Sequence, residues 1–197
     1  MAEVVWKQIV LDRQSKRDFE QQMLPHLDAA YNLARWLMRN GEDAEDAVQD
    51  AFLRAHQAFA SYQGGSEKAW LMTIVRNVCL TLLKRRIRSG NVVMLDEAMG
   101  EVEQASADIA PASLSSRPDA ELLAKIERAR VQTALRKLPQ NLREIVVLRE
   151  FEDLSYQEIS EVVGVPVGTV MSRLSRARER LKVLLAENEN GGRRNDM

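Results

Sequence analysis

The sequence predicts an all-α protein in which two small helical domains are joined by a flexible acidic linker. Apolar residues recur three and four positions apart across residues 16–87, and again after Asp119, which is the spacing of amphipathic helices. No sustained alternation or Val/Ile-rich run of the kind that predicts a strand interrupts the first stretch. With 197 residues, 45% of them hydrophobic and 29% charged, the chain can bury two modest cores.

Residues 42–55 are predicted to form a helix with two chemically different faces. One face is apolar and should point into the core: Ala44, Ala47, Val48, Ala51, Phe52 and Ala55. The opposite face carries carboxylates, an amide and one leucine: Glu42, Asp46, Gln49, Asp50 and Leu53. Such a face suits a basic helix of another protein, although an ordinary solvated acidic face is a common alternative.

A turn-rich loop at residues 61–66 precedes a helix that ends in a cluster of basic residues. The apolar stripe of this helix consists of Leu71, Ile74, Val75, Val78 and Leu82, and the opposite side carries Thr73, Arg76, Asn77 and Lys84. Residues 76–88 contain five bases and no acid, which predicts a cationic surface. Tyr62 and Trp70 could offer faces on which unstacked bases rest, although either aromatic alone is more often a core residue.

Residues 89–118 lose the helical spacing and contain Ser-Gly, Ala-Pro and Arg-Pro steps, which are typical of a flexible linker. Residues 91–121 carry seven acids against one base, so this segment could imitate nucleic acid. We therefore expect one domain at residues 1–88, a linker at 89–120, a second domain at 121–186 and a disordered tail at 187–197.

The second domain is predicted to be a bundle of about four helices, broken at Pro139, at residues 152–154 and at residues 164–166. Ser155 and Glu158 have the spacing of a capping box, which starts a helix sharply. Gly164 permits a turn and Pro166 suits the opening of the next helix. This order of signals predicts a helix-turn-helix.

The last helix should bury one stripe and expose a polar one. The predicted buried stripe is Val167, Val170, Leu174, Ala177 and Leu181. Arginine can donate two hydrogen bonds to a guanine edge, and hydroxyls can reach bases or phosphates. The candidate DNA contacts are Thr169, Ser172, Arg173, Ser175 and Arg176. A solvated helix face is the alternative for an isolated arginine-rich helix, but the capped helix and the Gly-Val-Pro turn favour DNA binding.

Composition excludes several other classes of protein. The net charge of −1 conceals a segregation of charge, because residues 128–182 carry eleven bases against seven acids. Cys79 stands alone, and His26 and His56 are far apart, so we expect no disulfide framework, metal or cofactor. No Gly-rich phosphate loop, paired metal carboxylates or activated nucleophile indicates an enzyme. We found no signal sequence or membrane-spanning run, so a cytoplasmic protein without membrane insertion is expected.

Leu154 to Leu181 resembles region 4 of the extracytoplasmic-function (group 4) sigma factors of RNA polymerase. Their signature is similar to Leu-Ser-Tyr-Glu-Glu-Ile, followed by Gly-Ile-Pro-Val-Gly-Thr-Val-Arg-Ser-Arg. The resemblance implies that this helix-turn-helix recognises the −35 promoter element. Met171 departs from the family pattern, which usually has Arg or Lys at this position.

Asp43 to Ala55 resembles the polymerase-binding helix of sigma region 2, which docks on the clamp coiled coil of the largest core subunit. The resemblance implies that Asp46, Gln49 and Asp50, with Leu53 beside them, contact core polymerase. It also implies that the following loop and helix melt the −10 element and hold the separated non-template strand. The residues expected there are Tyr62, Trp70, Arg76, Asn77, Lys84, Arg85 and Arg86, with Thr81 departing from the family's usual Asp.

Together these resemblances imply a sigma factor that directs promoter-specific initiation and is not an enzyme. Its implied partners are core RNA polymerase (clamp coiled coil and flap), promoter DNA and an anti-sigma factor acting in a stress or envelope response. Promoter elements roughly 17 base pairs apart are separated by about 60 Å, which about thirty linker residues can span. The leading alternative is a stand-alone helix-turn-helix regulator, which explains only the second half of the chain.

Overall fold

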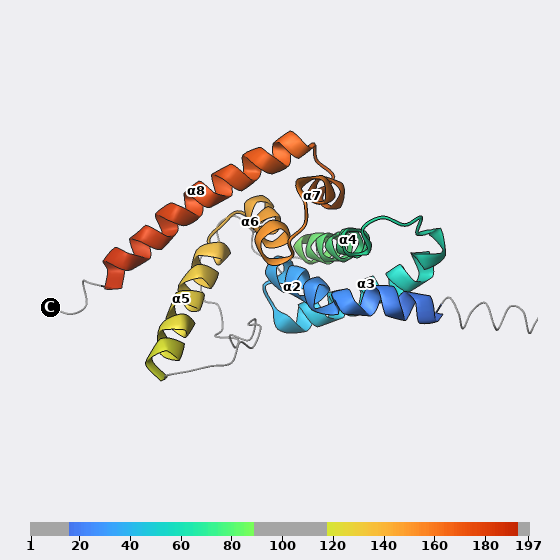
Figure 1. Cartoon of the computed structure of the whole chain (residues 1–197), viewed down its shortest axis with the longest axis horizontal. Coiled ribbons are helices and arrows are strands. Elements are labelled where there is room, and N and C mark those ends of the chain that lie inside the picture. The colour runs from blue at the N-terminus through green and yellow to red at the C-terminus, as the bar shows by residue number, and fades with distance from the viewer. Residues whose placement is uncertain (1–15, 89–117, 193–197) are drawn as a thin grey trace, which may run out of the picture.

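The computed structural model describes residues 16–88 and 118–192, and every regular element in these ranges is helical (Figure 1). After a helical stretch at residues 16–23, the N-terminal half contains η1 (Leu24–His26), α2 (Leu27–Met38), α3 (Gly41–Ala58), η2 (Phe59–Ser61) and α4 (Glu67–Arg88). The C-terminal half contains α5 (Pro118–Arg136), α6 (Gln140–Val146), η3 (Val147–Phe151), α7 (Tyr156–Val163) and α8 (Val167–Gly192). The predicted all-α class is confirmed.

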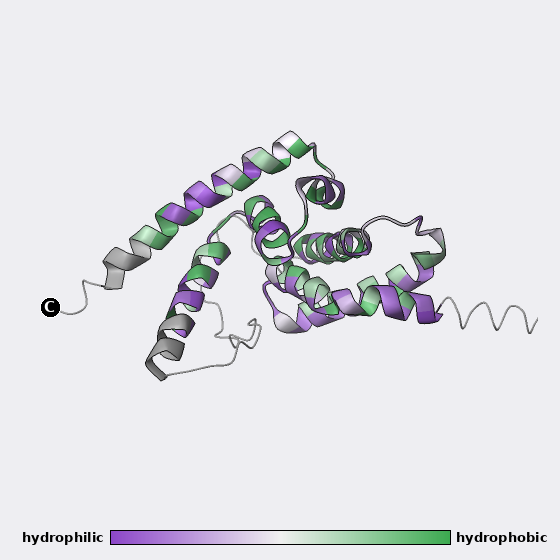
Figure 2. Ribbon diagram, viewed as in Figure 1, coloured by the Kyte–Doolittle hydropathy of each residue, from purple (hydrophilic) through white to green (hydrophobic). Residues whose placement is uncertain are grey.

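The N-terminal half is a three-helix bundle in which α2, α3 and α4 each pack against the other two. Helix α3 buries alanines along its inner face, and these small side chains let the neighbouring helices approach closely. The side chain of Asn40 caps α3 by accepting a hydrogen bond from the backbone N–H of Glu42 at 3.0 Å. The buried face predicted for α3 is confirmed, with Phe52 half-buried at its edge. In Figure 2 apolar and polar residues alternate along these helices, as is typical of amphipathic elements.

The C-terminal half has its breaks where the sequence predicts them, at Pro139, at residues 152–154 and at residues 164–166. The guanidinium of Arg143 is buried and donates to the carbonyl of Arg136 at 3.2 Å, which satisfies an end of α5. Burial lowers the pKa of Arg143 to about 10. Helix α6 then widens into the π-helical turn η3, where the N–H of Glu152 bonds to the carbonyl of Val147.

Helices α7 and α8 form the predicted helix-turn-helix. Ser155 and Glu158 make a reciprocal capping box, in which the Glu158 N–H donates to Ser155 Oγ at 3.2 Å and the Ser155 N–H to Glu158 Oε2 at 2.7 Å. Gly164 ends α7 with a φ of 72°, a conformation that strongly favours glycine. Pro166 accepts the first backbone hydrogen bonds of α8 from Thr169 and Val170. These local predictions are confirmed.

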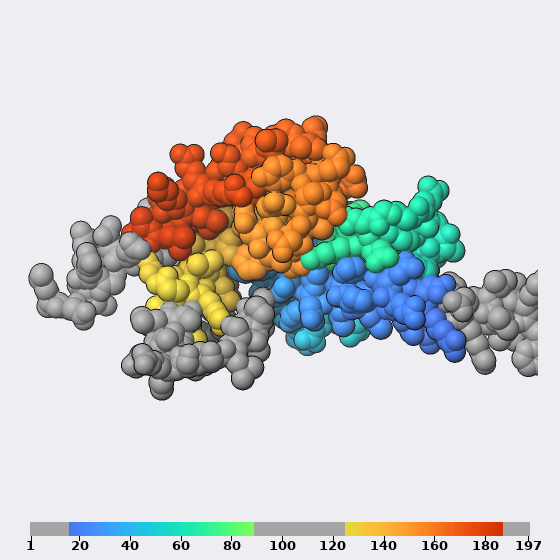
Figure 3. Space-filling view, in the orientation of Figure 1, coloured from blue at the N-terminus to red at the C-terminus, as the bar shows by residue number. Residues whose placement is uncertain are grey.

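The buried residues of the two halves form one continuous cluster, so the two cores are in contact. Helix α7 packs along α4, and α6 and η3 pack on α2, so the C-terminal half lies directly on the N-terminal half (Figure 3). The reason lies in α4, which is apolar on more than one side. Besides the predicted stripe, α4 buries Met72, Cys79 and Leu83.

Two helices extend into the ranges predicted to be linker and tail. Helix α5 begins at Pro118, within the range assigned to the linker, because proline suits the first turn of a helix. Helix α8 continues to Gly192, within the range assigned to the tail. The remainder of the predicted linker, with the acidity that could imitate nucleic acid, lies outside the described residues.

Candidate functional site

The outer face of α3 is open to solvent. Asp46 and Gln49 are exposed, and Leu53 beside them is 66% exposed. Asp50 lies at the edge of this face and accepts two hydrogen bonds from Arg54, at 2.9 and 2.8 Å. The hydrogen bond with Asp50 raises the pKa of Arg54. We call Asp46, Gln49, Asp50 and Leu53 the acidic face.

An aromatic cluster lies between η2 and the start of α4. The rings of Phe59 and Tyr62 are stacked, with centroids 6.2 Å apart and planes 18° apart, and the Tyr62 and Trp70 centroids are 5.1 Å apart. The Tyr62 hydroxyl donates to the carbonyl of Gly65 at 2.9 Å, which closes the intervening loop. Desolvation raises the pKa of Tyr62 above its ordinary value of 10.0. The structure therefore brings Tyr62 and Trp70 together.

The basic residues predicted on α4 do not share one environment. Asn77, Lys84 and Arg85 are exposed. Arg86 instead forms an ion pair with Asp43 of α3, whose side chain is 14% exposed. This guanidinium ties two helices of the N-terminal bundle together, which sequence spacing could not show because the partners are 43 residues apart.

Arg76 also takes part in an ion pair. Its guanidinium forms an ion pair with Glu144 of α6, and the two side chains are 17% and 4% exposed. Eight residues earlier on α4, Lys68 Nζ lies 2.9 Å from Glu152 Oε2 and donates to the Glu152 carbonyl at 2.7 Å. Asn32 of α2 donates to the other Glu152 carboxylate oxygen at 3.2 Å. Glu144 and Glu152 are functional candidates that the sequence analysis missed, since no local pattern marks their distant partners.

The polar side of α8 is open over its first three turns. Ser172, Ser175 and Arg176 are exposed, while Thr169 and Arg173 are half-buried, and the Ser172 hydroxyl donates to the Thr169 carbonyl at 3.0 Å. The predicted buried stripe is confirmed, with Val170, Leu174 and Ala177 buried and Val167 and Leu181 half-buried. All five predicted DNA-contacting residues therefore lie on one helix, on or beside its solvent-facing side.

The described residues contain no group of three or more His, Cys, Asp or Glu side chains that could hold a metal ion. Nor is any helix in the same ranges long and apolar enough to span a bilayer. Cys79 is buried in α4, and desolvation raises the pKa of its thiol to about 12. The thiol is therefore protonated at neutral pH.

The two halves match sequence models of the same family. A model described as Sigma-70 region 2 matches residues 23–89, and one described as Sigma-70, region 4 matches residues 128–181. The ECF RNA polymerase sigma factor SigE of Mycolicibacterium smegmatis is 36% identical over 178 residues, which cover 89% of this chain and 65% of that relative. The sigma-E factor of Escherichia coli strain K12 is 32% identical over 186 residues, which cover 91% of this chain and 94% of the relative.

Solved structures agree with these sequence relationships. The sigma factor RpoE of Bartonella quintana, in complex with the anti-sigma factor NepR, matches with a TM-score of 0.67 and 32% identity, covering 86% of this chain and 98% of that one. CnrH, in complex with the cytosolic domain of CnrY, matches with a TM-score of 0.61 and 27% identity, covering 90% and 96%. The chain therefore belongs to the extracytoplasmic-function (ECF) sigma factors of RNA polymerase and functions as a sigma factor in transcription initiation.

Proposed function

We propose that this sigma factor docks on core RNA polymerase through the acidic face of α3. The observation that carries the proposal is the exposure of Leu53 beside Asp46 and Gln49, which places one apolar side chain among hydrogen-bond acceptors. A basic helix of the clamp coiled coil would bury Leu53 and pair its cations with the carboxylates. Asp50 joins the interface by exchanging its bond to Arg54 for a cation of the polymerase.

The −10 element is recognised by the aromatic cluster together with the cationic side of α4. Once the DNA strands separate, unpaired bases can stack on Tyr62 and Trp70, because every base has an apolar face. Asn77 can read a base edge, and Arg76, Lys84 and Arg85 can contact phosphates. Arg86, already bound to Asp43, serves to hold α4 in place and adds positive potential near the strand.

The −35 element is read by α8 in the major groove. The N-terminal turns of a recognition helix are the part that reaches base edges, and Thr169, Ser172 and Arg173 occupy these turns. Ser175 and Arg176 follow one turn later on the exposed side. Met171 is 53% exposed in this surface, so it offers an apolar contact where the family usually has a cation.

Two further partners belong to this proposal. Exposed apolar side chains on α5 and α8, among them Val131 and Val183, offer a surface for the flap of core polymerase. The two structural neighbours were solved in complex with partner proteins, one of them the anti-sigma factor NepR. In the cytoplasm, an anti-sigma factor that covers the DNA-binding and polymerase-binding faces of this protein would prevent initiation.

The test is transcription in vitro with purified core polymerase on a library of promoter fragments. We expect discrete start sites that depend on this protein and that disappear with Asp46→Ala/Gln49→Ala. The matched control is Glu20→Ala/Gln21→Ala, which removes one exposed acid and one exposed amide from the helical stretch at residues 16–23. Initiation that survives the first pair, or that both pairs abolish equally, would reject the acidic face as the docking site.

The alternative of a stand-alone regulator gives a different result in the same experiment. A regulator binds duplex DNA tightly without polymerase and adds no core-dependent start sites. Strong duplex binding by the free protein, with no initiation, would therefore favour that alternative.

A further inference from the structure

The aromatic cluster of the −10 surface continues into the core of the N-terminal bundle. We call Phe19, Phe59, Tyr62 and Trp70 the aromatic row, because each ring in this order lies beside the next. We propose that Phe19 is a positioning residue for the −10 element, which fixes η2 and, through the row, the two rings on which an unpaired base stacks. The proposal deepens the function given above, on which it rests, by naming the support of the −10 surface.

Phe19 is the buried end of the row. It is 6% exposed and lies four residues before Met23, which is 0% exposed, so one side of this helical stretch faces the core. The Phe19 ring meets the rings of Phe52 and Phe59 edge to face, with centroids 6.3 and 5.4 Å apart and planes 84° and 85° apart. The His56 ring lies 5.1 Å away in the same geometry. Aromatic pairs prefer this arrangement, so Phe19 holds the end of α3 and the start of η2 together.

Phe59 connects this buried contact to the rings that stack on bases. It is the first residue of η2, and its ring is stacked with that of Tyr62 at 6.2 Å and 18°. The Tyr62 and Trp70 centroids are 5.1 Å apart, and their planes are tilted by 47°. A shift of η2 would change both this separation and this tilt. Because a binding site must hold its groups within about 0.5 Å and 10–20° of the productive geometry, such a shift would weaken base capture.

The loop that joins Tyr62 to α4 is shaped by its own backbone. The Tyr62 hydroxyl donates to the carbonyl of Gly65 at 2.9 Å, three positions away. Gly64 and Gly65 have φ values of 89° and 101°, and a Cβ added at either glycine would meet nothing within 4 Å. The hydrogen bond therefore shapes the turn without fixing where the turn lies on the bundle. The ring of Tyr62, stacked on Phe59, provides a contact that does.

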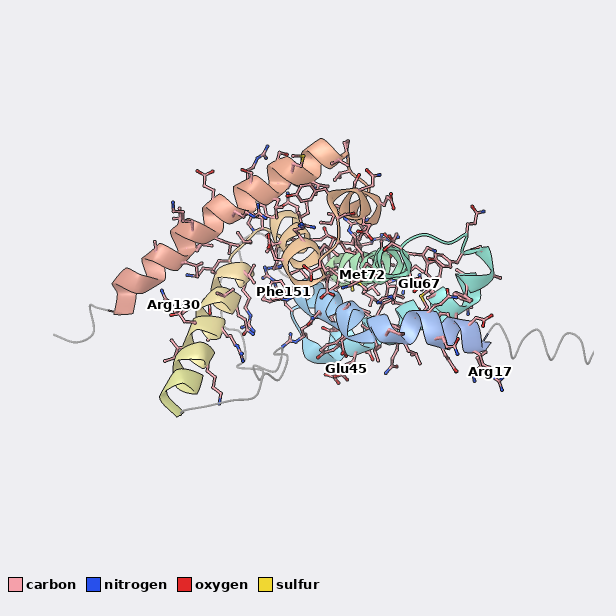
Figure 4. The ribbon with its side chains drawn as sticks, viewed as in Figure 1. Arg17, Glu45, Glu67, Met72, Arg130 and Phe151 are labelled. Carbon is pink, nitrogen blue, oxygen red and sulfur yellow. The ribbon has the colours of Figure 1, made fainter. Side chains whose placement is uncertain are left out.

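The two ends of the row belong to segments that meet at one end of the bundle. In Figure 4, Arg17 on the helical stretch and Glu67 on the first turn of α4 lie at this end. Arg17 lies two residues before Phe19, and Glu67 lies three residues before Trp70. A leucine in place of Phe19 would keep most of the apolar volume, but it has no ring edge to set against the neighbouring faces. The role of the ring can therefore be tested apart from burial.

The first measurement is fluorine NMR of the free, full-length protein labelled with 5-fluorotryptophan. The chain has three tryptophans, and Trp70→Phe identifies the Trp70 signal by its loss. We expect Phe19→Leu to move the Trp70 signal by more than its line width, although the two residues stand at opposite ends of the row. An unmoved Trp70 signal would overturn the positioning role of Phe19.

The matched control is Leu37→Ala, which removes a buried side chain far from the row. Leu37 is 2% exposed and lies in the last turn of α2. The other end of α2 follows His26, whose Nε2 lies 3.8 Å from Glu67 Oε2 at the start of α4. Leu37→Ala leaves a cavity and should lower the urea midpoint at least as much as Phe19→Leu, yet leave the Trp70 signal in place. Equal movement of that signal in both variants would overturn the proposal, because it would show a general loosening of the bundle.

A second variant protects the test against misfolding caused by the loss of Phe19. Phe59 is half-buried in the middle of the row, so Phe59→Leu removes less core contact. It should move the Trp70 signal at least as far as Phe19→Leu does, and circular dichroism checks that each variant remains helical. A Trp70 signal that Phe59→Leu leaves in place would overturn the connection through η2.

A base-capture assay connects the row to promoter opening. Core polymerase saturated with this protein is mixed with a promoter fragment that carries 2-aminopurine in the −10 non-template strand, whose fluorescence rises when the base leaves the stack. Phe19→Leu should lower this rise about threefold, and Trp70→Ala should lower it further because a whole stacking face is lost. Leu37→Ala should leave the rise unchanged.

The same assay separates the positioning role from the proposed function. Normal capture by Phe19→Leu, with Trp70→Ala defective, would overturn the role of Phe19 alone. Full capture by Trp70→Ala would reject the −10 surface of the proposed function, and the role of Phe19 with it.

Discussion

The two candidate DNA surfaces, on α4 and on α8, carry similar residues but differ in what surrounds them. On α8 the polar side faces solvent, and Arg176 is exposed. On α4 the predicted contact Arg76 forms an ion pair with Glu144 of the C-terminal half. Arg86 forms an ion pair with Asp43 of the neighbouring helix α3. Helical spacing thus indicates which side of a helix is polar, but it does not indicate whether that side is open.

The largest expected effect is on the free energy of unfolding, and it comes from the buried side of α8. Leu174 is 2% exposed beneath the predicted DNA contacts, and Leu174→Ala should lower the free energy of unfolding by about 2–5 kcal/mol, because it leaves a cavity. Urea unfolding followed by circular dichroism measures this change. The control Met171→Ala, at a 53% exposed position on the same helix, should change stability by less than about 0.5 kcal/mol. Equal effects at both positions would contradict the assignment of a buried and an open side.

The next effect concerns specificity. Arg176→Ala should weaken promoter binding by about 1–3 kcal/mol if its guanidinium contacts a base, and it should relax the preference at one −35 position. Holoenzyme binding to a set of single-base −35 variants measures both quantities. A uniform loss across all variants, with a smaller salt dependence, would assign Arg176 to a phosphate. Unchanged promoter binding by Arg176→Ala would show that Arg176 does not contact the DNA.

The features that the sequence predicts well depend on neighbours a few positions apart. The Val170 and Leu174 stripe follows from helical periodicity, and the Ser155 and Glu158 cap follows from a local motif. The breaks between helices follow from proline, glycine and turn residues. Each of these signals is local, so the fold class and the outline of the helix-turn-helix could be predicted.

The ion pairs between the two halves could not be predicted because their partners are distant in sequence. Arg76 and Glu144 are 68 residues apart, and Lys68 and Glu152 are 84 residues apart. A basic residue that binds DNA and one that binds a buried carboxylate look the same in a sequence. The additional apolar residues on α4, Met72 and Cys79, were a usable signal that this helix packs on more than one side.

The smallest expected effect tests the start of α7, where the helix-turn-helix meets the loop before α4. Ser155→Ala removes the side chain that caps this helix and should cost about 1 kcal/mol of stability. The control Ser175→Ala, at an exposed position inside α8, should be neutral or slightly stabilising, because alanine is the better helix former. Thermal unfolding at neutral pH distinguishes the two variants.

The same substitution should change how stability depends on pH. Hydrogen bonds from Ser155 and then from Ser66 lower the pKa of Glu158 below its ordinary value of 4.5. A lowered pKa means that the ionised carboxylate stabilises the folded state above pH 4.5, and that this contribution disappears as the pH falls through the lower value in the folded protein. Ser155→Ala should therefore lose part of the acid-induced decrease in stability, while Ser175→Ala retains it. Identical pH profiles for the two variants between pH 3 and 6 would show that the cap does not hold Glu158 in its charged form.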